Sequence, residues 1–72
     1  MKLPVRCQIP DERVRNEIKW LEIAEADGGY YLFQYVTVAE PPKWDSFYHS
    51  LDDVLEDCMQ GWNIAEAMWT EC

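Results

Sequence analysis

One stretch decides the fold: Ser50-Leu51-Asp52-Asp53-Val54-Leu55-Glu56-Asp57-Cys58-Met59-Gln60-Gly61. Its apolar residues recur at i, i+3, i+4, i+7 and i+8 and form one stripe along a predicted helix. Ser50 is a favourable N-cap, and Asp53 stands three residues later, in the position of a capping-box partner. Gly61 can adopt the left-handed conformation that ends a helix. We therefore expect one amphipathic helix, bounded by Ser50 and Gly61.

Two strands joined by a tight turn precede this helix. Residues 18–25 alternate in polarity, with Leu21 and Ile23 on one face. Residues 30–37 are aromatic or β-branched nearly throughout, which is typical of a strand. Between them, Ala26-Asp27-Gly28-Gly29 predicts a hairpin, because glycine supplies the positive φ of a tight turn. The second strand shows no water-facing side, since its two faces are Tyr30, Leu32, Gln34 and Val36, and Tyr31, Phe33 and Tyr35.

A loop and a third strand complete the predicted core. Residues 38–43 predict a loop, because Pro41 and Pro42 cannot sit in a central strand. Residues 44–49 then predict a third strand that leads into the helix. The expected fold is α+β, a three-stranded antiparallel β-meander with one amphipathic helix on one face (β-β-β-α). Residues 1–72 form one small domain, with the core at 17–69.

The two ends of the chain carry weaker patterns. Val5–Ile9 alternates between two prolines and indicates a short edge strand. A turn capped by Asp11 follows, and the pattern leaves the order of residues 1–16 open. Near the other end, Asn63 and Glu66 indicate a second cap. We expect a short C-terminal helical turn there that packs two apolar residues against the body: Ile64 and Trp69.

The charge of the chain is strongly acidic and unevenly distributed. Fourteen acidic and six basic residues give a net charge of −8. Residues 1–19 hold five basic and three acidic residues, for a charge of +2, whereas residues 20–72 hold one lysine and eleven acids, for −10. An acidic body repels phosphate backbones, so we expect no direct nucleic-acid binding and a basic protein as the partner. The alternative is that the charge serves only solubility.

Size and composition set further expectations. A chain of 72 residues buries only about 60% of the surface that it exposes when unfolded, so a binding surface is easier to build than an enclosed active site. No apolar run approaches the roughly 20 residues of a membrane span, and the chain does not begin like a secretory signal. The odd set of Cys7, Cys58 and Cys72 fits reduced thiols in the cytoplasm, with Cys58 in the core.

No motif for catalysis or for a metal or cofactor emerges. His49 lies near Asp45, Ser46 and Ser50, but neighbouring residues of one strand alternate faces and cannot converge as a catalytic triad does. His49 and the three cysteines are metal-ligand types without the paired spacing of a metal site. The segment Asp27-Gly28-Gly29 lacks the lysine and the following helix of a phosphate loop. We expect the protein not to be an enzyme.

One helix covers only one face of the predicted sheet, so the chain ends or a partner must cover the aromatic second face. The aromatic face and the acidic helix face are the expected contact surfaces, and Tyr and Trp dominate protein interfaces. The expected function is protein binding, in the form of an immunity- or antitoxin-like inhibitor of a basic partner. A self-associating homodimer and a nucleic-acid mimic are the alternatives. The candidate partner-binding residues are Asp45, Asp52, Asp53, Glu56, Asp57, Tyr31, Phe33 and Tyr35.

Four segments together resemble a known group of sequences: Trp20-Leu21-Glu22-Ile23, Asp27-Gly28-Gly29-Tyr30-Tyr31-Leu32-Phe33-Gln34-Tyr35, Asp45 through His49, and Ser50-Leu51-Asp52-Asp53-Val54-Leu55. A group of short uncharacterised bacterial proteins pairs a W-(I/L)-x-(I/V) strand and a D-G-G-aromatic turn with an S/T-L-(D/E)-(D/E)-A helix start. The likeness covers about residues 20–69. The strand that runs into an S-L-D-D helix start is also similar to HicB-like antitoxin domains and to some toxin-immunity proteins. This resemblance implies no catalytic residue.

Overall fold

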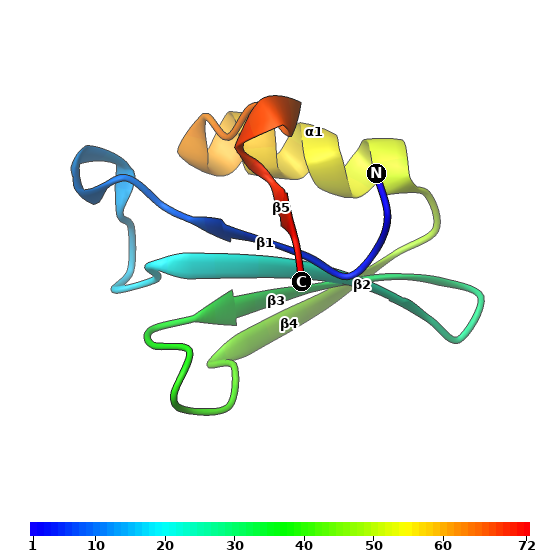
Figure 1. Ribbon diagram of the computed structural model, residues 1–72, viewed down its shortest axis with the longest axis horizontal. Helices are drawn as coiled ribbons and strands as arrows, with labels where there is room; N and C mark the ends of the chain where they lie inside the picture. Colours follow the sequence, from blue (N-terminus) through cyan, green and yellow to red (C-terminus); the bar gives the residue numbers. More distant parts are fainter.

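The fold is α+β, with one helix lying across one face of a five-stranded antiparallel sheet (Figure 1). The computed structural model describes residues 1–72. The strands are β1 (Val5–Gln8), β2 (Trp20–Ala26), β3 (Gly29–Tyr35), β4 (Trp44–Tyr48) and β5 (Thr70–Glu71). They lie side by side in the order β4-β3-β2-β1-β5. The helices are α1 (Leu51–Trp62) and two single 3-10 turns, η1 (Asp11–Arg13) and η2 (Glu66–Met68).

The hairpin of β2 and β3 forms the centre of the sheet. Ala26 pairs with Gly29, which leaves Asp27 and Gly28 as a two-residue turn. Both turn residues have positive φ, 56° and 78°, as the turn that matches strand twist requires. The predicted hairpin is therefore confirmed, and both strands begin and end within two residues of the predicted bounds.

The prediction of a three-stranded sheet is wrong, because both chain ends add strands to it. β1 pairs with β2, with Arg6 opposite Glu22, and β5 pairs with the first half of β1, with Thr70 opposite Arg6. β1 therefore lies inside the sheet, not at the predicted edge. A strand of two residues shows no alternation, so the sequence pattern could not reveal β5.

Helix α1 begins where predicted and ends two residues later than predicted. The Ser50 hydroxyl accepts a hydrogen bond from the backbone N–H of Asp53 at 3.1 Å, which confirms Ser50 as the N-cap. Gly61 does not end the helix. Asn63 ends it in the left-handed conformation (φ 56°, ψ 42°), and asparagine is the usual substitute for glycine at that position.

The caps predicted for the two short turns are also wrong. η1 follows Pro10 and not a capping Asp11, and η2 follows Ala65, since Asn63 is already used to end α1. The packing of the last turn is nonetheless confirmed. Ile64 is fully buried and Trp69 packs against the core.

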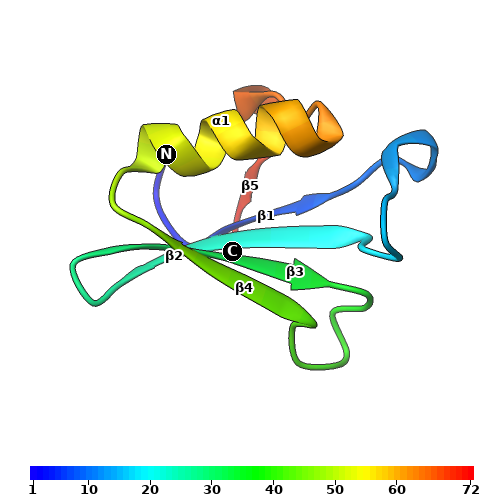
Figure 2. The same cartoon turned by 180° about the vertical axis from the view of Figure 1, so that it is seen from behind.

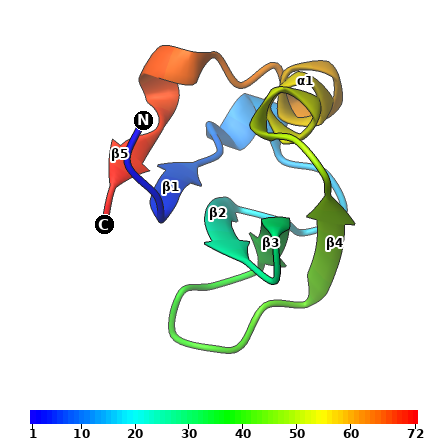
Figure 3. The ribbon, with the colours of Figure 1, turned by 90° about the vertical axis from the view of Figure 1, so that its right-hand side faces the viewer.

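The core lies between the sheet and a layer made of α1 and the segment that follows it (Figure 3). From the helix, Val54 and Cys58 are completely buried, as the apolar stripe predicts. They lie against the inward residues of the sheet, which include Leu21, Ile23 and Leu32. Viewed end-on, α1 lies over the side of the sheet formed by β3 and β4, whereas η2 lies over the side of β1 and β5. None of the helices has both the length and the apolar character needed to cross a membrane.

Replacing glycine by alanine should change the free energy of unfolding in opposite directions at two positions. A Cβ atom on Gly29 would lie 2.6 Å from the carbonyl oxygen of Tyr48 and would overlap the Phe47 ring. Gly29→Ala should therefore lower the free energy of unfolding by about 1–3 kcal/mol, the usual cost of overpacking. Gly61 lies within α1, and a Cβ there meets nothing within 4 Å. Gly61→Ala should raise the free energy of unfolding by about 0.5–1 kcal/mol. Urea titration of both variants measures this, and equal effects would contradict the packing described.

Candidate functional site

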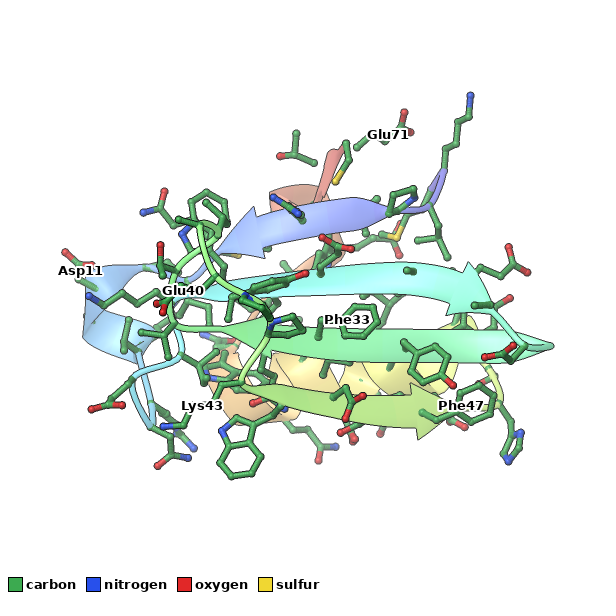
Figure 4. The ribbon with its side chains drawn as sticks, turned by 90° about the horizontal axis from the view of Figure 1, so that it is seen from below. Asp11, Phe33, Glu40, Lys43, Phe47 and Glu71 are labelled. Atoms are coloured by element: carbon green, nitrogen blue, oxygen red, sulfur yellow. The ribbon has the colours of Figure 1, made fainter.

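The face of the sheet turned away from α1 is the candidate functional surface (Figure 4). Strand alternation places Tyr31, Phe33 and Tyr35 on this outer face, opposite the buried Leu32. The chain ends extend the sheet sideways and do not cover this face. The loop at residues 36–43 crosses beneath one end of it, and Figures 3 and 4 both show this loop on the side away from the helix.

Three rings on the outer face form what we call the aromatic cluster: Tyr31, Phe33 and Phe47. The Tyr31 and Phe33 rings are stacked, with centroids 5.7 Å apart and planes 7° apart. Phe47, from β4, meets Tyr31 edge-on at 5.0 Å, and His49 meets Phe47 in the same way at 5.4 Å. Phe47 is 42% exposed, and the other two rings of the cluster are half-buried. The cluster is thus an ordered surface whose rings remain open to a partner.

Carboxylates border the aromatic cluster on three sides. Asp45 lies opposite Phe33 on β4, is exposed, and makes no hydrogen bond or ion pair within the chain. Asp27, in the hairpin turn, accepts a hydrogen bond from the Tyr31 hydroxyl at 3.1 Å, which raises the pKa of that phenol. Glu22 lies opposite Phe33 on β2 and is already neutralised by Arg6 at 2.6 Å. Asp45 is therefore the carboxylate beside the cluster that is free to pair with a partner's cation.

Tyr35 differs from the other two aromatic residues proposed for this face. It is only 9% exposed, at the end of the face that the loop at residues 36–43 crosses. The Arg6 guanidinium lies 5.6 Å from the centre of its ring, and burial raises the pKa of its hydroxyl. The ring of Tyr35 already has partners within its own chain, so it offers little contact area to another protein.

The helix acids lie on the opposite side of the molecule from Asp45. Asp52, Asp53 and Glu56 are exposed on α1. Asp57 accepts a hydrogen bond from the Tyr48 hydroxyl at 2.8 Å, and burial, aided by this bond, raises the pKa of Tyr48. The structure therefore does not join the helix acids and Asp45 into one continuous face. They form two separate acidic surfaces, with the sheet between them.

The remaining reactive side chains are not brought together. His49 is exposed beside Phe47, while the Ser50 hydroxyl is engaged in the helix cap. Cys7 and Cys58 are buried in the core, whereas Cys72 is exposed near the end of the sheet. No three His, Cys, Asp or Glu side chains of the chain are arranged to hold a metal ion.

Two exposed residues of β4 were missing from the predicted contact set. Phe47 completes the aromatic cluster, and Trp44 is 54% exposed beside Lys43, whose ammonium lies 5.9 Å from the centre of the indole ring. A signal was present in the sequence, because alternation within residues 44–49 places Phe47 on the same face as Asp45. The burial of Tyr35 had no such signal, since the Arg6 guanidinium that lies over its ring comes from β1, far away in the chain.

The three thiols should react in two classes. Burial raises the pKa of the Cys58 thiol to about 12 and also raises that of Cys7, so neither thiolate forms readily near pH 8. We expect Ellman's reagent at pH 8 to titrate one thiol in the folded protein, Cys72, and all three after unfolding. Cys72→Ser should leave no rapidly reacting thiol. Rapid reaction of a second thiol in the folded protein would contradict the burial of Cys7 and Cys58.

Comparisons with protein-family models, with curated proteins and with solved structures find no match to this chain.

Proposed function

We propose that this chain is a small non-enzymatic protein-binding domain, and that it contacts a basic partner through the outer face of its sheet. The observation that carries the proposal is the aromatic cluster, which stays partly exposed beside an unpaired carboxylate, Asp45. Ordered aromatic rings lose little side-chain entropy on binding and supply most of the energy at many protein interfaces.

The chemistry of this face favours a guanidinium or ammonium group. A cation can lie over the face of a tyrosine or phenylalanine ring while it pairs with a carboxylate. Arginine suits both contacts, because its planar group stacks on rings and binds carboxylates through two hydrogen bonds. The net charge of −8 would also draw a basic protein towards the chain. An inhibitor of the immunity or antitoxin type is the concrete form that we favour.

Two alternative functions use the same features differently. A nucleic-acid mimic would bind its partner through the row of acids on α1 and would be displaced by free DNA or RNA. A homodimer would cover the aromatic clusters of two copies with each other, a role supported by the exposure of Phe47. It would also bring two chains of charge −8 together, which opposes association at low salt.

Matched charge reversals test which surface binds the partner. Tagged protein is immobilised and used to retain proteins from a host cell extract at low and high salt. A basic protein should bind the wild type and Glu56→Lys, whose altered residue is exposed on α1, and should be released by salt. Asp45→Lys should retain at least about tenfold less of it, the loss expected when a repulsive charge replaces an interface carboxylate.

The other outcomes of this experiment are equally informative. Loss of binding in Glu56→Lys alone would move the contact to the helix and, with displacement by free DNA, would favour the mimic. Equal retention by all three proteins, or retention that salt does not change, would contradict the proposal. Circular dichroism of each variant checks that the fold is intact.

The homodimer makes a separate prediction about mass. If the proposed function is correct, sedimentation equilibrium should give the monomer mass across about two orders of magnitude in concentration. Screening by salt should not change this result. A dimer that dissociates in Phe33→Ser would instead favour the self-associating module.

A further inference from the structure

The outer edge of β4 has no partner within the chain. β4 is the last strand in the order β4-β3-β2-β1-β5, and Figure 2 shows it at the near side of the sheet, below α1. The carbonyl of Gln34 accepts a hydrogen bond from Lys43 at 2.8 Å, so the backbone of Gln34 faces β4. An antiparallel ladder alternates, so Leu32 and its partner Ser46 face each other in the same way. The N–H and C=O groups of Asp45 and Phe47 therefore point away from the sheet.

This edge has little of the protection that exposed edges usually carry. Natural sheets block their edges with lysines, prolines, bulges or a covering segment. The opposite edge is formed by β5, which has only two residues and is too short to pair with much of another strand. β4 has five residues, a single charged side chain, Asp45, and two of the most exposed large apolar residues of the chain, Trp44 and Phe47. A peptide in an extended conformation could pair with it.

Both sides of the β4 edge are acidic. On the outer side lies Asp45, next to the aromatic cluster. On the helix side, Asp57 is placed beside β4 by its hydrogen bond with Tyr48. Asp53 lies one turn before Asp57 on the same side of α1, because residues four apart on a helix are neighbours. The two acidic surfaces on opposite sides of the molecule thus both approach this edge.

We propose that an extended basic segment of the partner protein pairs with β4 as a sixth strand of the sheet. This inference rests on the proposed function and specifies how the partner binds. The side chains of an added strand alternate, so one set would meet Asp45 and Phe47 while the other would meet Tyr48, Asp53 and Asp57. Basic residues on both faces of one strand would complement both acidic sides. A second copy of this chain fits less well, because its β4 carries the same acidic flanks.

A peptide of two Arg-Arg-Val-Val repeats tests the inference, because its strand form carries arginine and valine on both faces. It should bind with an affinity that falls as salt rises. On binding, hydrogen exchange of the Asp45 and Phe47 amides should slow by at least about tenfold, since they become hydrogen-bonded. The Ser46 amide already faces β3 and serves as the internal control.

A form of the peptide methylated on every backbone amide nitrogen separates this inference from the proposed function. Its side chains and charge are unchanged, but it cannot donate to β4 from either edge, whereas methylation of alternate nitrogens would leave one donating edge in this repeat. The methylated peptide should bind at least about tenfold more weakly, and Asp45→Asn should weaken the unmodified peptide while keeping the edge N–H.

The possible results distinguish failure of strand addition from failure of the proposed function. Equal binding of the methylated and unmethylated peptides, or binding without protection of Asp45 and Phe47, would overturn strand addition and leave a basic partner on the outer face intact. Binding that is unaffected both by salt and by Asp45→Asn would contradict the proposed function itself. Absence of any peptide binding, together with a partner whose retention survives Asp45→Lys, would overturn both.

Discussion

The structure depends on the packing of one short helix against one face of the sheet. The apolar stripe of α1 supplies Val54 and Cys58, which are completely buried against Leu21, Ile23 and Leu32 from the two central strands. A helix with its side chains is only about 10 Å wide, whereas five strands spaced by about 4.8 Å span roughly twice that. The helix therefore cannot cover even one face alone, and the segment after Asn63 completes the layer over β1 and β5.

The outer face is consequently divided into two parts. At one end, Arg6 pairs with Glu22 and lies over Tyr35, and the loop at residues 36–43 crosses the same end of the face. At the other end, the aromatic cluster has no cover from the chain. Arg6 comes from β1, so a strand that the sequence pattern predicts at the edge of the sheet closes this end of the outer face. The open end belongs instead to β3 and β4.

The sequence predicted those parts of the fold that depend on local chemistry. The Ser50 cap, the Asp27-Gly28 turn and the alternation of β2 each involve residues close in the chain, and the structure confirms them. The end of α1 was misplaced because two residues, Gly61 and Asn63, both tolerate the left-handed conformation, and only the packing after the helix selects the second. The two added strands required contacts across most of the chain, such as Arg6 with Thr70, which no local pattern encodes.

The same distinction applies to the candidate site. Tyr31, Phe33 and Asp45 share a face because strand register is set by hydrophobic alternation and a tight turn, both of which are visible in the sequence. Whether a residue on that face is open or covered depends on contacts between segments far apart in the chain, such as Arg6 over Tyr35, which no local pattern encodes. Tyr35 and Phe33 illustrate this, since they lie two residues apart on one strand and differ in exposure.

Asp45 has two effects at this edge: it opposes pairing between copies of the chain, and it favours the proposed binding of a basic partner. An edge strand with exposed Trp44 and Phe47 would invite pairing between copies, and a charge in such a strand is a recognised obstacle to it. The obstacle is selective, because a carboxylate repels an acidic copy and attracts a basic strand. With Asp53 and Asp57 on the other side of the same edge, the electrostatic field favours one class of partner from both directions. An uncharged residue at position 45 would weaken the discrimination on the outer side of the edge while leaving every backbone group of the edge in place.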